Sequence, residues 1–130
     1  MIDVKVDEEA RMCTKALESE LTGVLNKRAV YCVVAIIGST EHGAVDPLDK
    51  IFLLRETFQK KGLSFVIHSD AAWGGYFASM IRKRSARLYT KTGELSYVPR
   101  LSMSDYTLKQ LEKLYIADSI TVDPHKFVCT

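Results

Sequence analysis

The sequence predicts an α/β fold, with a mainly parallel sheet flanked by helices. Two patterns lead to this prediction: short apolar and β-branched runs alternate with segments of helical periodicity, and each run leads into small or polar residues. The segments between the runs are long enough to cross back over a sheet as helices, as parallel neighbours require. With 130 residues, 47% of them hydrophobic, the chain is expected to form a single domain, 1–130, with a buried core.

The first part of the chain predicts an edge strand, a helix and a buried strand. Residues 1–6 alternate between apolar and polar side chains, as a short edge strand does. Leucine and valine recur at helical spacing from Thr14, the predicted N-cap, to Arg28. Residues 29–37, AVYCVVAII, are apolar without alternation, which is typical of a strand buried on both faces of a parallel sheet.

The middle of the chain predicts a helix followed by a second strand. Asp46 is the predicted N-cap of this helix, and Pro47 takes its first position, where the missing N–H of proline does no harm. Residues 63–67 then predict a strand that delivers Asp70 to the same edge of the sheet as Thr40.

The last part predicts a loop, a helix and a third buried strand. Residues 76–81 continue briefly as helix, whereas 82–103 show no sustained period and predict a loop. Ser104 is the predicted cap of a helix that runs to Tyr115. Residues 117–122 complete the pattern as a strand.

Charge and hydropathy argue against two classes of partner. A formal net charge of +2 is too small to predict nucleic-acid binding. The basic residues gather at 82–87, where a solvated surface loop is the ordinary explanation and a polyanion site the alternative. The longest apolar run, 29–37, is too short to cross a bilayer, and the acidic N-terminus lacks a signal pattern. We therefore expect a cytoplasmic protein that binds neither nucleic acid nor membranes.

The cysteines argue against a metal site and a disulfide framework. Cys13, Cys32 and Cys129 have no short metal-ligand spacing, and their odd number leaves one outside any pairing. This pattern is typical of a reduced, intracellular setting, and no metal ligand is predicted.

Polar residues at the ends of the second and third predicted strands supply the chemistry of a cofactor site. An aldehyde cofactor needs a primary amine that holds it as a Schiff base, and a pyridine ring needs a carboxylate that keeps its nitrogen protonated. Lys126 and Asp70 can supply these two groups. Small and hydroxylated residues at 38–40 end the first strand, at the edge where open α/β sheets bind their ligands.

Three segments resemble a known family. HSDAAWGG at 68–75, DSITVDPHK at 118–126 and GSTEHGAVDPLDKI at 38–51 are similar to the core of the pyridoxal phosphate dependent amino acid decarboxylases of group II, which include tyrosine, aromatic amino acid and glutamate decarboxylases. The resemblance implies a partial pyridoxal phosphate transferase-like (fold type I) large domain and pyridoxal 5'-phosphate as the cofactor. A long segment such as 82–103 is found in the tyrosine decarboxylase branch.

The resemblance implies a role for five residues. Lys126 is the catalytic residue and holds the cofactor covalently, while Asp70 pairs with the pyridine nitrogen. Ala72 lies flat against one face of the ring, and Thr40 lies beside the ring. His125 contacts the phosphate.

For several of these residues the pattern alone allows a structural explanation. Thr40 can instead satisfy backbone groups in a turn, and a lysine such as Lys126 is ordinarily a solvated surface charge. His125, beside a proline, can be an ordinary turn residue. Trp73 is predicted to pack as a wall, and His42 is predicted to be a surface imidazole.

The activity implied by the resemblance is decarboxylation of an L-amino acid, tyrosine-like or otherwise aromatic, to an amine and carbon dioxide. The full-length enzyme is expected to be a homodimer. Enzymes of this group are several times longer, so we expect the chain to be the central part of the cofactor-binding domain, without the upstream and C-terminal portions. It then has open sheet edges and at least one uncovered face.

Two alternatives remain at this point. The first is a catalytically inactive, truncated fragment that binds cofactor or dimerises. The second is a carbon–carbon lyase of the same fold, against which the PHK and DAAWGG segments argue.

Overall fold

The computed structural model describes residues 1–81 and 103–126. Its helices and strands are α1 (Thr14–Val24), β1 (Cys32–Ile36), α2 (Leu48–Gln59), β2 (Val66–Asp70), α3 (Ala78–Ile81), α4 (Asp105–Glu112) and β3 (Ser119–Thr121). Short 3-10 helices cover Gly74–Phe77, Leu114–Ile116 and Pro124–Lys126.

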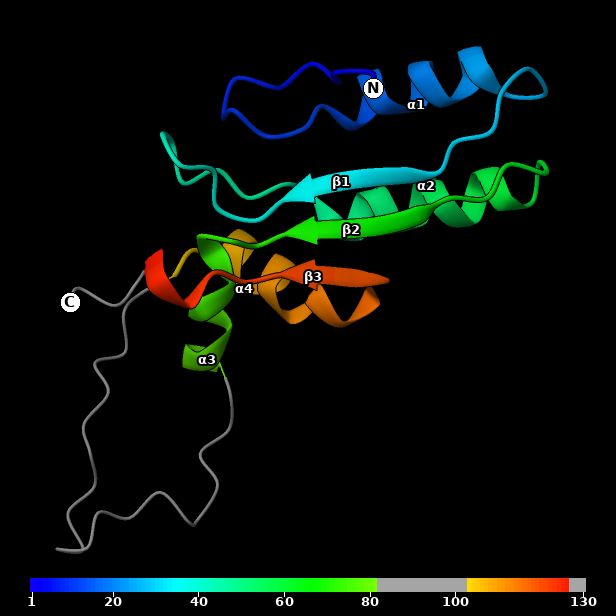
Figure 1. Ribbon diagram of the computed structural model, residues 1–130. Helices are drawn as coiled ribbons and strands as arrows, with labels where there is room; N and C mark the ends of the chain where they lie inside the picture. Colours follow the sequence, from blue (N-terminus) through cyan, green and yellow to red (C-terminus); the bar gives the residue numbers. More distant parts are fainter. Residues whose placement is uncertain (82–102, 127–130) are drawn as a thin grey trace, which may run out of the picture.

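The strands form a parallel sheet in the order β1-β2-β3 (Figure 1). Ile36 pairs with Asp70 and Asp70 pairs with Thr121, so the three strands end in one row. The chain passes through α2 between the first two strands and through α4 before the third. This arrangement confirms the predicted α/β fold with a parallel sheet and flanking helices.

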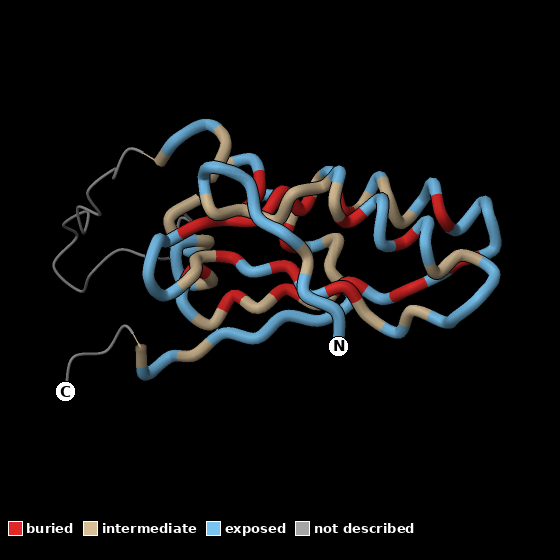
Figure 2. Tube along the Cα trace, turned by 90° about the horizontal axis from the view of Figure 1, so that it is seen from above, coloured by how far each residue is buried: buried red, intermediate tan, exposed pale blue. Residues whose placement is uncertain are grey.

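The core lies between the helices and one face of the sheet. Alternate strand residues are buried in it, among them Val33, Ala35 and Ile67. Figure 2 shows buried and exposed positions alternating along the chain. Leu17 and Leu21 of α1 join the same cluster, as the helical spacing predicted. Burial of each large apolar side chain stabilises the fold by about 1.5–3 kcal/mol.

The other face of the sheet is uncovered within the described residues. Val34, Ile36 and Val66 are 47%, 43% and 39% exposed, and every residue of β3 is exposed. The prediction that 29–37 is buried on both faces is therefore wrong for this part of the chain, and so is the prediction that 117–122 is a buried strand, because nothing in the described residues packs against this face. The expected uncovered face is confirmed.

Two of the predicted helix caps are wrong, and one is confirmed. Thr14 is the first helical residue of α1 and not its cap. Helix α2 begins at Leu48, its N-cap is Pro47, and the side chain of Asp46 makes no cap bond to it. The N–H of Asp49 in its first turn is instead bound by the side-chain oxygen of Gln110 from α4, at 3.1 Å. Ser104 caps α4 as predicted, because its hydroxyl accepts from the backbone N–H of Thr107 at 3.2 Å.

Several boundaries also differ from the prediction. The second strand is Val66–Asp70, three residues later than 63–67, so Asp70 is its last residue. The predicted edge strand 1–6 contributes only a bridge between Val6 and Met12, outside the sheet. The predicted helix ending at Tyr115 divides into α4 and a 3-10 helix. The predicted loop at 82–103 and the basic run at 82–87 lie outside the described residues, apart from Met103.

Within residues 1–81 and 103–126, no helix is long and apolar enough to span a membrane.

Candidate cofactor site

A hairpin follows β1 and forms the turn that carries Thr40. The N–H groups of Gly38 and Ser39 both donate to the carbonyl of Ala44 at 2.9 Å. The hydroxyl of Ser39 in turn accepts from the N–H of Ala44 at 3.0 Å. Ser39 therefore satisfies the turn, whereas Thr40 is exposed beyond it. This division leaves the hydroxyl of Thr40 available at the carboxyl edge of the sheet.

Glycines bring the segment after β2 into contact with the strands on both sides. The N–H of Gly74 donates to the carbonyl of Ile37 at 2.9 Å, and a Cβ at position 74 would lie 2.2 Å from that oxygen. A Cβ at Gly75 would lie 2.7 Å from a methyl group of Val122. The sequence analysis missed this role, although two consecutive glycines after a strand signal a close backbone approach.

Asp70 ends β2 with its backbone held on both sides. Its carbonyl accepts from the N–H of Ile37 at 2.8 Å. Its register partners Ile36 and Thr121 are exposed on the uncovered face, so the half-buried Asp70 side chain shares that face with them. One carboxylate oxygen accepts from the N–H of Ala72 at 3.2 Å. The other oxygen is available for a ligand.

Lys126 lies in the 3-10 helix that follows β3. Its Nζ is 2.8 Å from a carboxylate oxygen of Asp123 and 5.6 Å from the centre of the Trp73 ring. The hydrogen bond from Lys126 lowers the pKa of Asp123, and the charge of Lys126 and that of His125 add to the effect. His125 itself is exposed. The amine is thus held by Asp123 and lies close to Trp73, in the segment that follows Asp70.

The structure places the predicted residues at the carboxyl edge of the sheet, but hydrogen bonds do not connect all of them. The backbone of Asp123 donates to the carbonyl of Ala72 at 3.4 Å, which connects the segment of Lys126 with that of Asp70. Among the described residues, no hydrogen bond or ion pair links Asp70 directly to Lys126. Thr40 approaches the same edge from β1.

A cavity of about 340 Å³ lies next to this edge. It is bounded by the hairpin, by the 3-10 helix Gly74–Phe77 and by α4, and its lining is largely apolar. Thr40 and Trp73 line it, whereas Asp70 and Lys126 do not. The cavity therefore adjoins the candidate site without containing the groups that would bind the cofactor.

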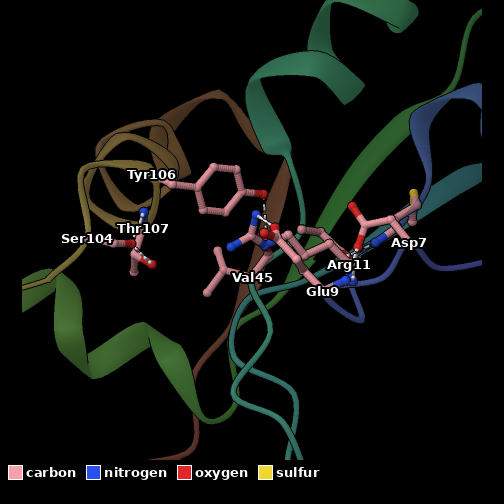
Figure 3. A network of polar contacts seen from close by, with 9 residues as sticks. Asp7, Glu9, Arg11, Val45, Ser104, Tyr106 and Thr107 are labelled. Atoms are coloured by element: carbon pink, nitrogen blue, oxygen red, sulfur yellow. Dashed lines mark hydrogen bonds and ion pairs between the residues drawn. The ribbon is translucent and has the colours of Figure 1, made fainter.

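Tyr106 of α4 holds the returning arm of the hairpin (Figure 3). Its hydroxyl donates to the carbonyl of Val45 at 2.8 Å, and the guanidinium of Arg11 lies 3.7 Å from the centre of its ring. Burial raises the pKa of Tyr106 to about 12. The hairpin is thus fixed to α4 and to the segment that precedes α1, called here the N-terminal arm.

Asp46 closes the base of the same hairpin. It is only 5% exposed, and its two carboxylate oxygens accept from the backbone N–H groups of Met12 at 2.6 Å and Ile36 at 2.7 Å. Burial raises the pKa of Asp46 above its ordinary value, although these two hydrogen bonds oppose the shift. The sequence analysis assigned Asp46 to a helix cap and missed this role.

A family model described as the pyridoxal-dependent decarboxylase conserved domain matches residues 1–91. The chain belongs to this family. The match includes the β1 hairpin and the turn after Asp70, and it confirms the resemblance found in the sequence. The cofactor of the family is pyridoxal 5'-phosphate.

Relatives in this family act on different amino acids, according to their names. An L-tyrosine decarboxylase of Levilactobacillus brevis is 35% identical over 97% of the chain and 22% of its own length. An L-2,4-diaminobutyrate decarboxylase of Acinetobacter baumannii is 33% identical over 97% of the chain and 19% of its own length. The chain thus spans about a fifth of the length of these relatives.

The fold is also similar to that of a solved decarboxylase structure. A crystal structure of mouse CSAD in apo form matches with a TM-score of 0.57 and 30% identity, over 95% of this chain and 20% of that one. The parallel sheet and its helices therefore have the fold of part of a fold type I large domain.

The donor groups at the carboxyl edge fit the chemistry of this cofactor. Lys126 provides an amine for an aldehyde, and Asp70 provides a carboxylate for a pyridinium nitrogen. The small side chain of Ala72 leaves space next to Asp70, and His125 and Thr40 offer an imidazole and a hydroxyl at the two sides. Asp70 is the last residue of β2, and the other groups come from segments that follow a strand.

Proposed function

We propose that this chain supplies the central part of the cofactor site of a pyridoxal phosphate dependent L-amino acid decarboxylase. The full-length enzyme would convert its substrate to an amine and carbon dioxide. The register of the sheet supports this proposal most directly, because Asp70 at the end of β2 pairs with Thr121 at the end of β3, and the turn carrying Lys126 follows β3 at the same edge.

Each of the five site residues has a distinct task in the proposed enzyme. When bound, pyridoxal phosphate supplies a ring that accepts the electrons left by the departing carboxylate. Lys126 attaches to the aldehyde, and Asp70 keeps a proton on the pyridine nitrogen. His125 binds the phosphate and Thr40 contacts the ring. Ala72 lies against one ring face, where a larger side chain would displace the cofactor.

The ion pair of Lys126 sets a condition for attachment. The Nζ of Lys126 lies 2.8 Å from a carboxylate oxygen of Asp123 and 5.6 Å from the centre of the Trp73 ring. To hold the aldehyde of the cofactor, the amine would have to leave this pair.

We propose a tyrosine-like or other aromatic amino acid as the substrate, and a cytoplasmic homodimer as the full-length enzyme. Support for the substrate comes from tyrosine decarboxylases that match 97% of the chain at 35% and 32% identity. The diaminobutyrate decarboxylase is nearly as similar, at 33%. An assay of the full-length enzyme with both amino acids, following carbon dioxide release, tests the preference; turnover of diaminobutyrate alone would contradict it.

The uncovered face of the sheet favours a second candidate function. Val34 and Ile36 are about half exposed on a strand that is apolar throughout. A fragment with this surface can associate with a full-length relative without catalysing a reaction. Failure of Lys126 to react with the cofactor, together with formation of a mixed dimer, would favour this alternative.

The first test is to trap the cofactor on the chain itself. The purified 130-residue protein is incubated with pyridoxal phosphate and reduced with borohydride, and the modified lysine is located by peptide mass spectrometry. Labelling confined to Lys126 is the expected result. Labelling scattered over surface lysines, or none, would contradict the proposed site.

Lys109 provides a matched control for this experiment. Like Lys126 it is paired with an aspartate, with its Nζ 2.6 Å from Asp49. Lys109→Arg is expected to leave the labelling unchanged, whereas Lys126→Arg is expected to abolish it. Equal loss in both variants would show that the reaction reports exposed lysines and not a site.

A further inference from the structure

Asp46 is a buried carboxylate held by backbone groups instead of a cation. It is 5% exposed, and within residues 1–81 and 103–126 no lysine or arginine forms an ion pair with it. Burial of an unpaired carboxylate is unfavourable unless strong hydrogen bonds compensate. Its contacts to Met12 and Ile36, at 2.6 and 2.7 Å, are charge-assisted bonds of this kind.

The contact to Ile36 closes the hairpin at its base. The N–H of Asp46 donates to the carbonyl of Ile36 at 2.9 Å, while the N–H of Ile36 donates to the Asp46 carboxylate. The carboxylate thereby replaces a backbone carbonyl opposite the last residue of β1. The bridge between Ile37 and Val45 follows immediately. The start of the turn that carries Thr40 is therefore fixed by Asp46.

The same carboxylate ties the hairpin to the N-terminal arm. Met12 lies 34 positions before Asp46, and its N–H is bound by the second oxygen. One side chain thus joins the arm, the end of β1 and the start of α2. The loss of either oxygen as an acceptor releases one of these backbone segments.

This junction borders the proposed cofactor residues directly. Ile36 is the register partner of Asp70. The next residue, Ile37, donates to the carbonyl of Asp70 and accepts from the N–H of Gly74. A shift of the end of β1 therefore moves the backbone that presents Asp70 as well as the turn that presents Thr40.

We propose that Asp46 is a positioning residue for the cofactor. Its carboxylate holds the end of β1 and so keeps Thr40 and Asp70 where both can contact the ring. The inference rests on the proposed function. Asp46 touches neither cofactor nor substrate and acts through the backbone of Ile36.

Asp46→Asn tests the inference with little change in size. An amide has one oxygen, and its NH₂ group cannot accept a bond, so one of the two backbone N–H groups loses its partner. The concentration of pyridoxal phosphate that half-labels Lys126 is expected to rise about tenfold, as for the loss of one hydrogen bond to a charged group. Labelling is measured well below the melting temperature of each variant.

Two controls separate positioning from general stability. Asp49→Asn removes the carboxylate in the first turn of α2 that pairs with Lys109 of α4, and it is expected to leave the labelling midpoint unchanged. Phe58→Leu destabilises the core at the far end of α2. If Phe58→Leu lowers the melting temperature as much as Asp46→Asn and weakens labelling equally, the positioning role is wrong.

A second measurement needs no substitution at Asp46. Cofactor binding and ordering of the backbone that positions the cofactor are thermodynamically linked, so a bound cofactor should slow hydrogen exchange in that backbone. Hydrogen exchange at the amides of Ile36 and Met12 is expected to slow when Lys126 carries the reduced cofactor, relative to amides in the last turn of α2. Unchanged exchange at Ile36 would overturn the inference even if Asp46→Asn does not fold.

The two proposals fail in different ways. If the unsubstituted chain is not labelled at Lys126, the proposed function is wrong for this chain. If Lys126 is labelled and Asp46→Asn is labelled at the same midpoint, only the positioning role of Asp46 is wrong.

Discussion

Two aspartates, one at each edge of the sheet, make the same pair of backbone contacts. At the carboxyl edge Asp46 donates to the carbonyl of Ile36 at 2.9 Å and accepts from its N–H at 2.7 Å. At the amino edge Asp118 makes the same two contacts to Ile67, also at 2.9 and 2.7 Å. Each carboxylate therefore completes the hydrogen bonding of a strand where no strand partner continues.

The surroundings of the two carboxylates differ. Asp118 pairs with Arg55 at 2.5 Å, and its side chain is 43% exposed. Asp46 is buried, and its carboxylate accepts a hydrogen bond from a second backbone N–H, that of Met12, in place of an ion pair. The amino edge thus uses a solvated ion pair, whereas the carboxyl edge holds a buried charge beside the candidate site. This difference indicates that the carboxyl edge is the more constrained of the two.

The largest effect is expected from a glycine at the constrained edge. In Gly74→Ala the new Cβ would lie 2.2 Å from the carbonyl oxygen of Ile37, a backbone atom that cannot turn away. The backbone must shift, and we expect the free energy of unfolding to fall by about 3 kcal/mol or more. Urea denaturation followed by circular dichroism measures this loss.

Gly23→Ala is the matched control for this prediction. Gly23 lies in α1, and a Cβ there would have no atom within 4 Å. Alanine is the better helix former, so we expect the free energy of unfolding to rise by roughly 0.5 kcal/mol. A loss of stability in Gly23→Ala comparable to that in Gly74→Ala would mean that close packing at Ile37 is not the cause.

The two aspartates themselves give the next largest difference. Asp46→Ala leaves two backbone N–H groups without an acceptor in a buried place, and we expect it to lower the free energy of unfolding by about 2–4 kcal/mol. Asp118→Ala should lower it by about 1 kcal/mol, because water can reach the groups left behind. Thermal unfolding of both variants measures the difference.

Measuring both variants at low and at high salt tests this comparison further. In 1 M salt the contribution of Asp118 should shrink, because its ion pair with Arg55 is screened, whereas that of Asp46 should persist. Equal losses for the two variants at both salt concentrations would contradict the contrast between a buried and a solvated carboxylate.

The fold was predictable where the signals are local. Apolar runs predicted the strands β1 and β2, and the helical spacing of Leu17 and Leu21 predicted α1. The cap formed by Ser104 depends on a residue three positions away, so the sequence near it is sufficient. The burial of β1 was not predictable, because it depends on what packs against each face and not on the period of the run.

The candidate site was predictable only in part, for the same reason. The order of the motifs placed Asp70 and Lys126 at one edge, since parallel strands end together. Asp46 before Pro47 has every local feature of a cap, yet its partner Met12 lies 34 residues away. The approach of Gly74 to Ile37 is also a contact between distant segments. The sequence gives no signal for the contact of Asp46, and the paired glycines signal a close approach without identifying Ile37 as the partner.

The smallest effect is expected from Tyr106, which holds the hairpin from α4 through the carbonyl of Val45. Tyr106→Phe removes the hydrogen bond to Val45 and should lower the free energy of unfolding at pH 7 by about 1 kcal/mol. Burial raises the pKa of this phenol to about 12, so the folded chain holds the proton more tightly than the unfolded chain. The resulting stability is complete below about pH 10 and is lost as the pH rises towards 12. Denaturant melts across this range should show a decline that Tyr106→Phe removes and that Tyr31→Phe, at an exposed position, retains. If the decline persists in Tyr106→Phe, the alkaline sensitivity arises elsewhere and the hairpin is held at the Asp46 side alone.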